Sequence, residues 1–173
     1  MADLASFIRD VPDFPKPGIV FKDITPLLAN GRALRTAVNG MAEPFRGQVD
    51  VVLGVESRGF ILGAAVAYAL DVGLAIVRKP GKLPAATHAA TYELEYGSDS
   101  LEIHQDALGD GHRVLLIDDL LATGGTARAA IELVDRLHGK LVGASFLIEL
   151  EFLHGRDRLS PVPVHALIRY GSE

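Results

Sequence analysis

The stretch that decides the fold runs Val114-Leu115-Leu116-Ile117-Asp118-Asp119-Leu120-Leu121-Ala122-Thr123-Gly124-Gly125-Thr126. Four apolar residues end in two adjacent carboxylates, Asp118 and Asp119, and a short loop rich in Thr and Gly follows. A continuous apolar run bounded by turn signals is typical of a strand that is buried on both faces of a parallel sheet. The carboxylates would then lie at its carboxyl end, where open α/β sheets bind ligands.

The loop after the two acids supplies candidate phosphate-binding residues, namely Ala122, Thr123, Gly124, Gly125 and Thr126. Glycines let the backbone approach a ligand closely, and successive amides at a helix N-terminus bind anions. The paired acids beside it suit the vicinal hydroxyls of a sugar, whereas an acid pair alone could be a solvated strand end. The whole stretch therefore predicts a ribose 5-phosphate site, with the acids on the ribose and the loop on the 5-phosphate.

Two better-known nucleotide-binding motifs do not fit the sequence. The loop lacks the Gly-x-x-x-x-Gly-Lys-Ser/Thr spacing of a P-loop, and no Lys falls where the phosphates would need one. No Gly-x-Gly-x-x-Gly fingerprint follows an expected strand. P-loop nucleotide hydrolysis and dinucleotide binding are therefore set aside.

Composition limits the classes of protein to consider. The chain has 173 residues, a formal net charge of −5 and no Cys. Disulfides, thiolate catalysis and Cys-based zinc sites are thus impossible, and the acidic balance argues against nucleic acid or an anionic membrane as the main partner. The N-terminus, Met1-Ala2-Asp3-Leu4, has neither the basic nor the apolar region of an export signal. We expect a cytoplasmic protein with no nucleic-acid or membrane partner.

The pattern along the chain alternates strands and helices within one domain, residues 1–173. Expected helices cover residues 34–45, residues 60–70 and the segment after Thr126. Expected parallel strands cover residues 49–55, 72–77, 114–117, 141–147 and 165–168, and residues 91–94 and 100–104 are expected to form a two-stranded flap. Residues 59–77 are too interrupted, by Gly63, Asp71 and Gly73, to form one membrane helix. The alternation predicts an α/β fold, a Rossmann-like parallel sheet flanked by helices.

Several further segments carry a resemblance to a known family: PKPGIVFKDITP (15–26), ESRGF (56–60), RKPGKLP (78–84), YELEYG (92–97), LEIH (101–104) and LLATGGT (120–126). Together they resemble the type I phosphoribosyltransferases and, within these, the adenine phosphoribosyltransferases, colinearly over nearly the whole chain. The resemblance implies that fold, with an N-terminal hood (1–30) and a β-flap (83–104). It also implies that adenine and 5-phosphoribosyl-1-pyrophosphate (PRPP) give AMP and pyrophosphate, with Mg²⁺ carried by PRPP and no direct metal ligand on the protein.

Displacing pyrophosphate requires cations around a polyanionic leaving group. Arg58 follows one expected strand at the same rim of the sheet as the acids, and Arg78, Lys79 and Lys82 follow the next. We expect these residues to bind pyrophosphate and Arg58 to act in catalysis as well. The alternatives are a surface turn for Arg58 and a solvated charged face for the others. The resemblance also implies a possible non-proline cis peptide at Glu56–Ser57.

The family pattern assigns adenine recognition to the hood. Backbone groups of Val20 and Lys22 would read the purine edge, Phe21 would stack on the ring, and Leu150 would form the far side of the slot. Hypoxanthine would place an oxygen against the same backbone carbonyl, so the wrong base is rejected. Lys22 stands where many relatives carry Arg, and any side-chain contact there loses the guanidinium fork. The alternative for Phe21 is plain core packing.

The flap carries the remaining implied roles. In the family, the residue at Glu95 handles a purine proton and the residue at Tyr96 closes the site over PRPP, as a mobile flap permits. The alternative for Glu95 is a solvated hairpin residue. The Arg78 loop and the apolar residues 60–70 suggest a homodimer, with Arg78 either at the dimer contact or at the ligand.

Two other functions stay open at this stage. A phosphoribosyltransferase for another purine base would share the PRPP site, although the hood segment argues against it. A non-catalytic PRPP- or nucleotide-sensing regulator usually carries a DNA-binding module or a basic RNA-binding face. This chain has no spare length for such a module and is acidic overall.

Overall fold

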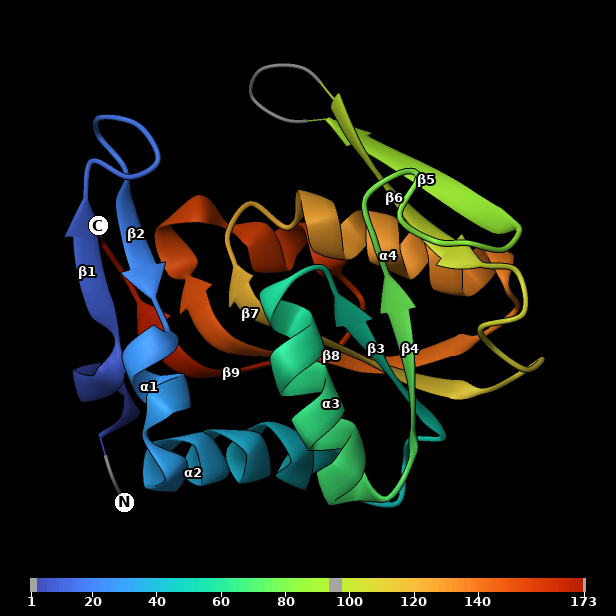
Figure 1. Cartoon of the computed structure of the whole chain (residues 1–173), viewed down its shortest axis with the longest axis horizontal. Helices are drawn as coiled ribbons and strands as arrows, with labels where there is room; N and C mark the ends of the chain where they lie inside the picture. Colours follow the sequence, from blue (N-terminus) through green and yellow to red (C-terminus); the bar gives the residue numbers. More distant parts are fainter. Residues whose placement is uncertain (1–2, 94–97, 173) are drawn as a thin grey trace.

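The computed structural model describes residues 3–93 and 98–172, and its centre is a five-stranded sheet with the order β4-β3-β7-β8-β9 (Figure 1). The strands are β3 (Val51–Val55), β4 (Gly73–Val77), β7 (Arg113–Leu121), β8 (Lys140–Leu150) and β9 (Val164–Tyr170). Each pairs in parallel with its neighbours. The expected parallel α/β sheet is confirmed.

Helices cover both faces of the sheet, because its strands are apolar on both sides. Leu115 and Ile117 pack in the cluster of buried side chains formed with α1 (Thr25–Ala29), α2 (Gly31–Ala42) and α3 (Arg58–Leu70). Val114 and Leu116 pack in the opposite cluster, with α4 (Gly125–Arg136). The short 3₁₀ turns are η1 (Leu4–Phe7), η2 (Glu43–Phe45), η3 (Glu151–Leu153) and η4 (Gly155–Leu159). In this described part of the chain, no helix is long and apolar enough to cross a membrane.

Two antiparallel hairpins stand at opposite ends of the sheet (Figure 1). The first, β1 (Arg9–Pro12) with β2 (Val20–Asp23), lies beside β9, since the Lys22 ammonium is 4.3 Å from the centroid of the Tyr170 ring. The second, β5 (Thr87–Glu93) with β6 (Ser98–His104), is tied to the segment after β4 by reciprocal backbone hydrogen bonds between Arg78 and Glu102. The second corresponds to the expected flap and begins earlier in the chain, whereas the first hairpin was not expected.

The central strand is longer than the sequence indicates, and this corrects the expected position of the two acids. Asp118 and Asp119 lie inside β7, not after it. Pairing between β7 and β3 ends at Ile117, while pairing between β7 and β8 continues to Leu121. The acids therefore lie beyond the last residue of β7 that pairs with β3, on a part of β7 that pairs with β8 alone.

Helix boundaries also differ from the expected ones. The residues expected at 34–45 form α2 from Gly31 and then a separate 3₁₀ turn that contains Pro44, because a proline in a helix interior removes a backbone donor. Arg58 is the first residue of α3, whereas the sequence pattern placed it in a turn before the helix. The Glu56–Ser57 peptide that precedes it is cis, as the family resemblance implied.

Candidate functional site

The two carboxylates of β7 lie against the first turn of α3. The Arg58 guanidinium Nε is 2.5 Å from Asp119 Oδ2, and Asp119 is nearly fully buried. Asp118 Oδ1 accepts a hydrogen bond of 2.9 Å from the Asp119 N–H. A Cβ on Gly59 would lie 2.8 Å from Asp118 Oδ1 and 3.0 Å from the Ile117 carbonyl oxygen. Glycine at position 59 therefore allows α3 to contact the acid pair directly.

The environment of Asp118 disfavours a second negative charge. Burial is the main cause that raises the pKa of Asp118 well above its ordinary value, and the neighbouring Asp119 carboxylate adds to it. The Asp119 N–H and the Arg58 guanidinium act in the opposite direction, but less strongly. A ligand whose hydroxyls donate hydrogen bonds to these acids would stabilise their charged forms. Vicinal ribose hydroxyls are such a ligand.

The 122–126 loop forms a separate small cavity next to the acids. This cavity of about 80 Å³ is lined by Asp118 and by residues 120–127. Gly124 is the N-cap of α4 and has a left-handed backbone, with φ of +82°. The first turn of α4 therefore follows directly, and its free amides and positive dipole end favour an anion. The structure brings Asp118 and the predicted 5-phosphate residues to one cavity, while Asp119, next in the chain, lies outside its lining and pairs with Arg58.

The residues predicted for adenine share one larger cavity. Val20, Phe21, Lys22 and Leu150 line a space of about 340 Å³, together with residues of the 122–126 loop. The Phe21 ring packs edge-on against Phe14, with 5.1 Å between the ring centroids. The Arg58 guanidinium carbon lies 4.9 Å from the Phe21 ring centroid, so Arg58 connects this cavity to the acid pair.

The side chain of Lys22 is engaged in holding the N-terminal hairpin to the sheet. Its Nζ donates to Asp10 Oδ1 at 2.9 Å and lies over the Tyr170 ring. Val20 and Lys22 are two residues apart on β2. Backbone groups two residues apart on a strand point to the same side. The backbone of Val20 and Lys22 can thus serve a ligand along one strand edge.

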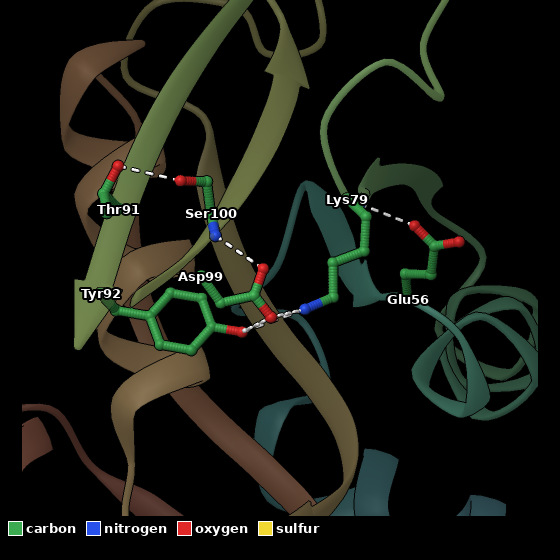
Figure 2. Close-up of polar contacts among 6 residues, drawn as sticks. All are labelled: Glu56, Lys79, Thr91, Tyr92, Asp99 and Ser100. Atoms are coloured by element: carbon green, nitrogen blue, oxygen red, sulfur yellow. Dashed lines mark hydrogen bonds and ion pairs between the residues drawn. The ribbon is translucent and has the colours of Figure 1, made fainter. Parts of the chain in front are cut away.

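The cationic segment after β4 is anchored by an acid at the end of β3. Glu56 accepts hydrogen bonds from the Lys79 N–H at 2.7 Å and from Arg78 Nη2 at 3.1 Å (Figure 2 shows the first). Burial alone would raise the pKa of Glu56, but these two donors and the Arg78 charge outweigh it and hold the pKa below its ordinary value. The Arg78 Nη1 also donates to the Lys82 carbonyl at 3.1 Å. The Arg78 guanidinium therefore binds Glu56 and the backbone of its own segment.

Lys79 joins the same segment to the β5–β6 hairpin (Figure 2). Its Nζ forms an ion pair with Asp99, and the Tyr92 hydroxyl donates to the same carboxylate at 3.2 Å. The exposed Lys82 side chain has no hydrogen bond or ion pair within residues 3–93 and 98–172. Glu95 and Tyr96, which the sequence pointed to for catalysis, lie outside the described residues.

Sequence reasoning missed the acids that hold the cations. Glu56 belongs to the 56–60 motif and Asp99 to the expected flap (83–104), but neither was predicted to bind the cations. A signal was present for Glu56, because the carboxyl ends of two neighbouring parallel strands meet at one edge, which brings this acid to the cations after β4. Asp99 had no such signal, since its contact depends on how the hairpin folds over Lys79.

The acid pair has the donor chemistry that a magnesium ion requires. Carboxylate oxygens suit Mg²⁺, which is commonly bound through one or two carboxylates together with substrate phosphates. No cluster of three or more potential metal-ligating side chains occurs in the described parts of the chain. Asp118 and Asp119 therefore fit an ion that a phosphorylated ligand brings with it.

The raised pKa of Asp118 predicts that Asp118→Asn stabilises the fold at neutral pH. Above pH 3.8, the ordinary value, Asp118 holds its proton more tightly in the native state than in the unfolded state. The contribution of Asp118 to the stability of the native state therefore falls as pH rises through the shifted pKa. The amide removes this penalty and keeps an acceptor for the Asp119 N–H. Each kcal/mol gained should raise Tm by about 2–4 °C, and the gain should vanish near the ordinary carboxyl pKa. Thermal unfolding over a pH series measures this.

Asp119→Asn is the matched comparison, because it breaks the ion pair with Arg58 and should not stabilise the protein. A Tm of Asp118→Asn at or below that of the unsubstituted protein at neutral pH would contradict the assignment of a charge penalty to Asp118.

Comparisons with known proteins agree with this site. A family model described as a phosphoribosyl transferase domain matches residues 22–160. An adenine phosphoribosyltransferase from Acaryochloris marina is 58% identical over 169 residues, which are 97% of this chain and 99% of the relative. One from Myxococcus xanthus is 56% identical, over 98% of this chain and 93% of the relative.

Solved structures show the same likeness. The adenine phosphoribosyltransferase of Thermoanaerobacter pseudethanolicus superposes with a TM-score of 0.94 at 49% identity, covering 96% of this chain and 98% of that one. The enzyme of Saccharomyces cerevisiae, solved with adenine and an imino-altritol bisphosphate, gives 0.89 at 40% identity over 96% and 99% of the two chains. With a type I phosphoribosyltransferase fold and this similarity over its whole length, the chain belongs to the adenine phosphoribosyltransferase family.

Proposed function

We propose that the site transfers the 5-phosphoribosyl group of PRPP to adenine, giving AMP and pyrophosphate, and so salvages the free purine. One observation carries this proposal. Residues of the hood and of the 122–126 loop line the same cavity of about 340 Å³. A purine on Phe21 and a ribose phosphate on the loop would thus be neighbours within one site. Family membership supports the same reaction.

Adenine would bind against Phe21 with its polar edge on the backbone of β2. The backbone groups of Val20 and Lys22 point to the same side of β2 and would meet the exocyclic amine and the ring edge beside it. Leu150 lies at the wall of the same cavity. The Lys22 side chain is committed to Asp10 and Tyr170, so the Lys at this position contributes its backbone and the packing of the hairpin.

Ribose 5-phosphate would bind along the end of β7. Asp118 and Asp119 would accept hydrogen bonds from the 2- and 3-hydroxyls, and the amides and hydroxyls of the 122–126 loop would donate to the phosphate. The first turn of α4 adds its positive dipole end. Because these groups are fixed before the ligand arrives, little ordering of the protein is needed at the moment of binding.

The leaving pyrophosphate would lie among Arg58, Lys79 and Lys82, while Arg78 supports their segment through Glu56. These cations stabilise the charge that develops as the bond from the anomeric carbon to the pyrophosphate oxygen breaks. A magnesium ion carried by PRPP would neutralise part of the same charge. Glu95 remains our prediction for the group that handles the purine proton, and Tyr96 for closure over PRPP.

A base panel tests the proposal. Protein, PRPP and Mg²⁺ are mixed with adenine, hypoxanthine, guanine, xanthine or orotate, and the nucleotide products are separated and identified. We expect AMP from adenine and no product from the others, because an oxo base leaves two acceptors facing each other at the Val20–Lys22 edge.

Asp118→Asn and Asp119→Asn serve as controls for the ribose assignment, and each should lower the rate of AMP formation by at least about tenfold. Formation of a nucleotide from another base would support the assignment of the PRPP site and contradict the assignment of adenine recognition to the hood. A protein that binds PRPP but forms no nucleotide from any base would instead support the alternative function, a non-catalytic PRPP- or nucleotide-sensing regulator.

We also propose that the active form is a homodimer in which α3 and β4 face a second copy. β4 is an edge strand, and the large apolar side chains of Ile61, Tyr68 and Leu74 on these elements are 50%, 88% and 40% exposed. A monomer leaves this apolar surface in water, whereas a second copy buries it. The face continues toward the Arg78 segment, which follows β4 directly.

Sedimentation velocity tests this assembly. The unsubstituted protein should sediment at twice the 18.5 kDa mass of one chain, and Ile61→Asp combined with Leu74→Asp should shift it to the monomer. Lys140→Asp, at an exposed position on β8, is the charge control and should leave the mass unchanged. A dimer that persists in the double variant would place the interface elsewhere.

A further inference from the structure

The 122–126 loop rests directly on the backbone of η4, which is far from it in the sequence. A Cβ on Gly155 would lie 2.0 Å from the Ala122 carbonyl oxygen and 3.0 Å from the Gly124 nitrogen. In return, a Cβ on Gly124 would lie 2.6 Å from the Gly155 carbonyl oxygen. The two backbones therefore touch, and neither glycine has room for a side chain.

The backbone conformation of Gly155 does not itself require glycine. Gly155 is not among the residues with a positive φ, whereas Gly124 is, at +82°. An L-residue could adopt the Gly155 conformation without strain. The requirement for glycine at position 155 thus comes from its contact with the loop alone.

An ion pair anchors η4 in this position. Arg156 donates from Nε to Glu149 Oε1 at 2.9 Å and from Nη2 to Glu149 Oε2 at 2.5 Å, and its Nη1 donates to the Val164 carbonyl at 2.6 Å. The Glu149 side chain is 5% exposed. A bidentate guanidinium–carboxylate pair fixes both distance and orientation. The residue after it, Asp157, is exposed and plays no part in this anchor.

The anchor is built on the strand that runs beside the loop. Glu149 belongs to β8 and is the register partner of Leu121, the last residue of β7 before the loop. At the other end of η4, Leu159 is fully buried in the core cluster that contains α4. The loop is therefore held between α4, which continues it, and a 3₁₀ turn that is fixed to the neighbouring strands.

We propose that Gly155 and the Glu149–Arg156 pair are positioning residues that hold the 122–126 loop in the shape that receives the 5-phosphate of PRPP. This inference rests on the proposed function. It adds that phosphate affinity depends on residues outside the ligand cavity, since neither Gly155 nor Arg156 lines it. Purine binding uses the hood and meets the loop through Ala122 and Thr123 alone, so it should depend on these residues less than phosphate binding does.

Steady-state kinetics of Gly155→Ala test the inference. The methyl group displaces the Ala122 carbonyl, and a displacement of about 1 Å costs up to about 100-fold in a positioned interaction. We expect the KM for PRPP to rise between about 10- and 100-fold, and the KM for adenine to rise much less, because the adenine cavity meets the loop at Ala122 and Thr123 alone. Calorimetry should show that the affinity for AMP falls more than the affinity for adenine. Gly31→Ala is the control, because a Cβ at Gly31 has no neighbour within 4 Å.

Arg156→Lys keeps the test decisive if Gly155→Ala does not fold. Lysine retains the charge but loses the fork, so the KM for PRPP should rise more than the KM for adenine. Arg158→Lys on the same 3₁₀ turn, an exposed position, should behave like the unsubstituted protein. A folded Arg156→Lys protein, or a folded Gly155→Ala protein, with an unchanged KM for PRPP would overturn the inference, as would an equal rise in both KM values. Failure of the proposed function is a different result, namely an unsubstituted protein that forms no AMP.

Discussion

The site depends on a difference in length between two neighbouring strands. β7 pairs with β3 as far as Ile117 and with β8 as far as Leu121, so its acid pair lies past the last residue that pairs with β3. The first turn of α3 occupies the space that β3 leaves, and Gly59 allows it to touch the carboxylates. A strand that stopped at Ile117 would release the acids into a loop. The length of β7 therefore turns two acids into a fixed pair beside Arg58.

Charge in the site is arranged locally, against the acidic balance of the chain. The formal net charge is −5, yet the cations of the site are gathered at the carboxyl ends of β3 and β4. Glu56 holds the segment after β4, and Asp99 holds the ammonium of Lys79. Binding a polyanion would exchange some of these protein acids for phosphate oxygens. Without a ligand, the protein acids orient this segment and neutralise part of its positive charge.

The sequence predicted the elements of the sheet better than their boundaries. The apolar run 114–117 predicts the central strand directly. Aspartates are poor strand formers, so the sequence predicts that this strand ends before them. Pairing with β8 overrides that preference. The first hairpin has short strands, one ending in Pro12, and shows no apolar alternation. The contact between Gly124 and Gly155 joins segments distant in sequence. A single sequence contains no local pattern for such a contact.

A crystal structure with AMP tests the central claim most directly, because AMP joins the purine and the 5-phosphate in one molecule. The account predicts that the phosphate lies on the amides of the 122–126 loop, the ribose hydroxyls on Asp118 and Asp119, and the purine against Phe21. The backbone of Val20 and Lys22 would meet its polar edge. A phosphate bound away from the loop, or a purine outside the hood cavity, would contradict it.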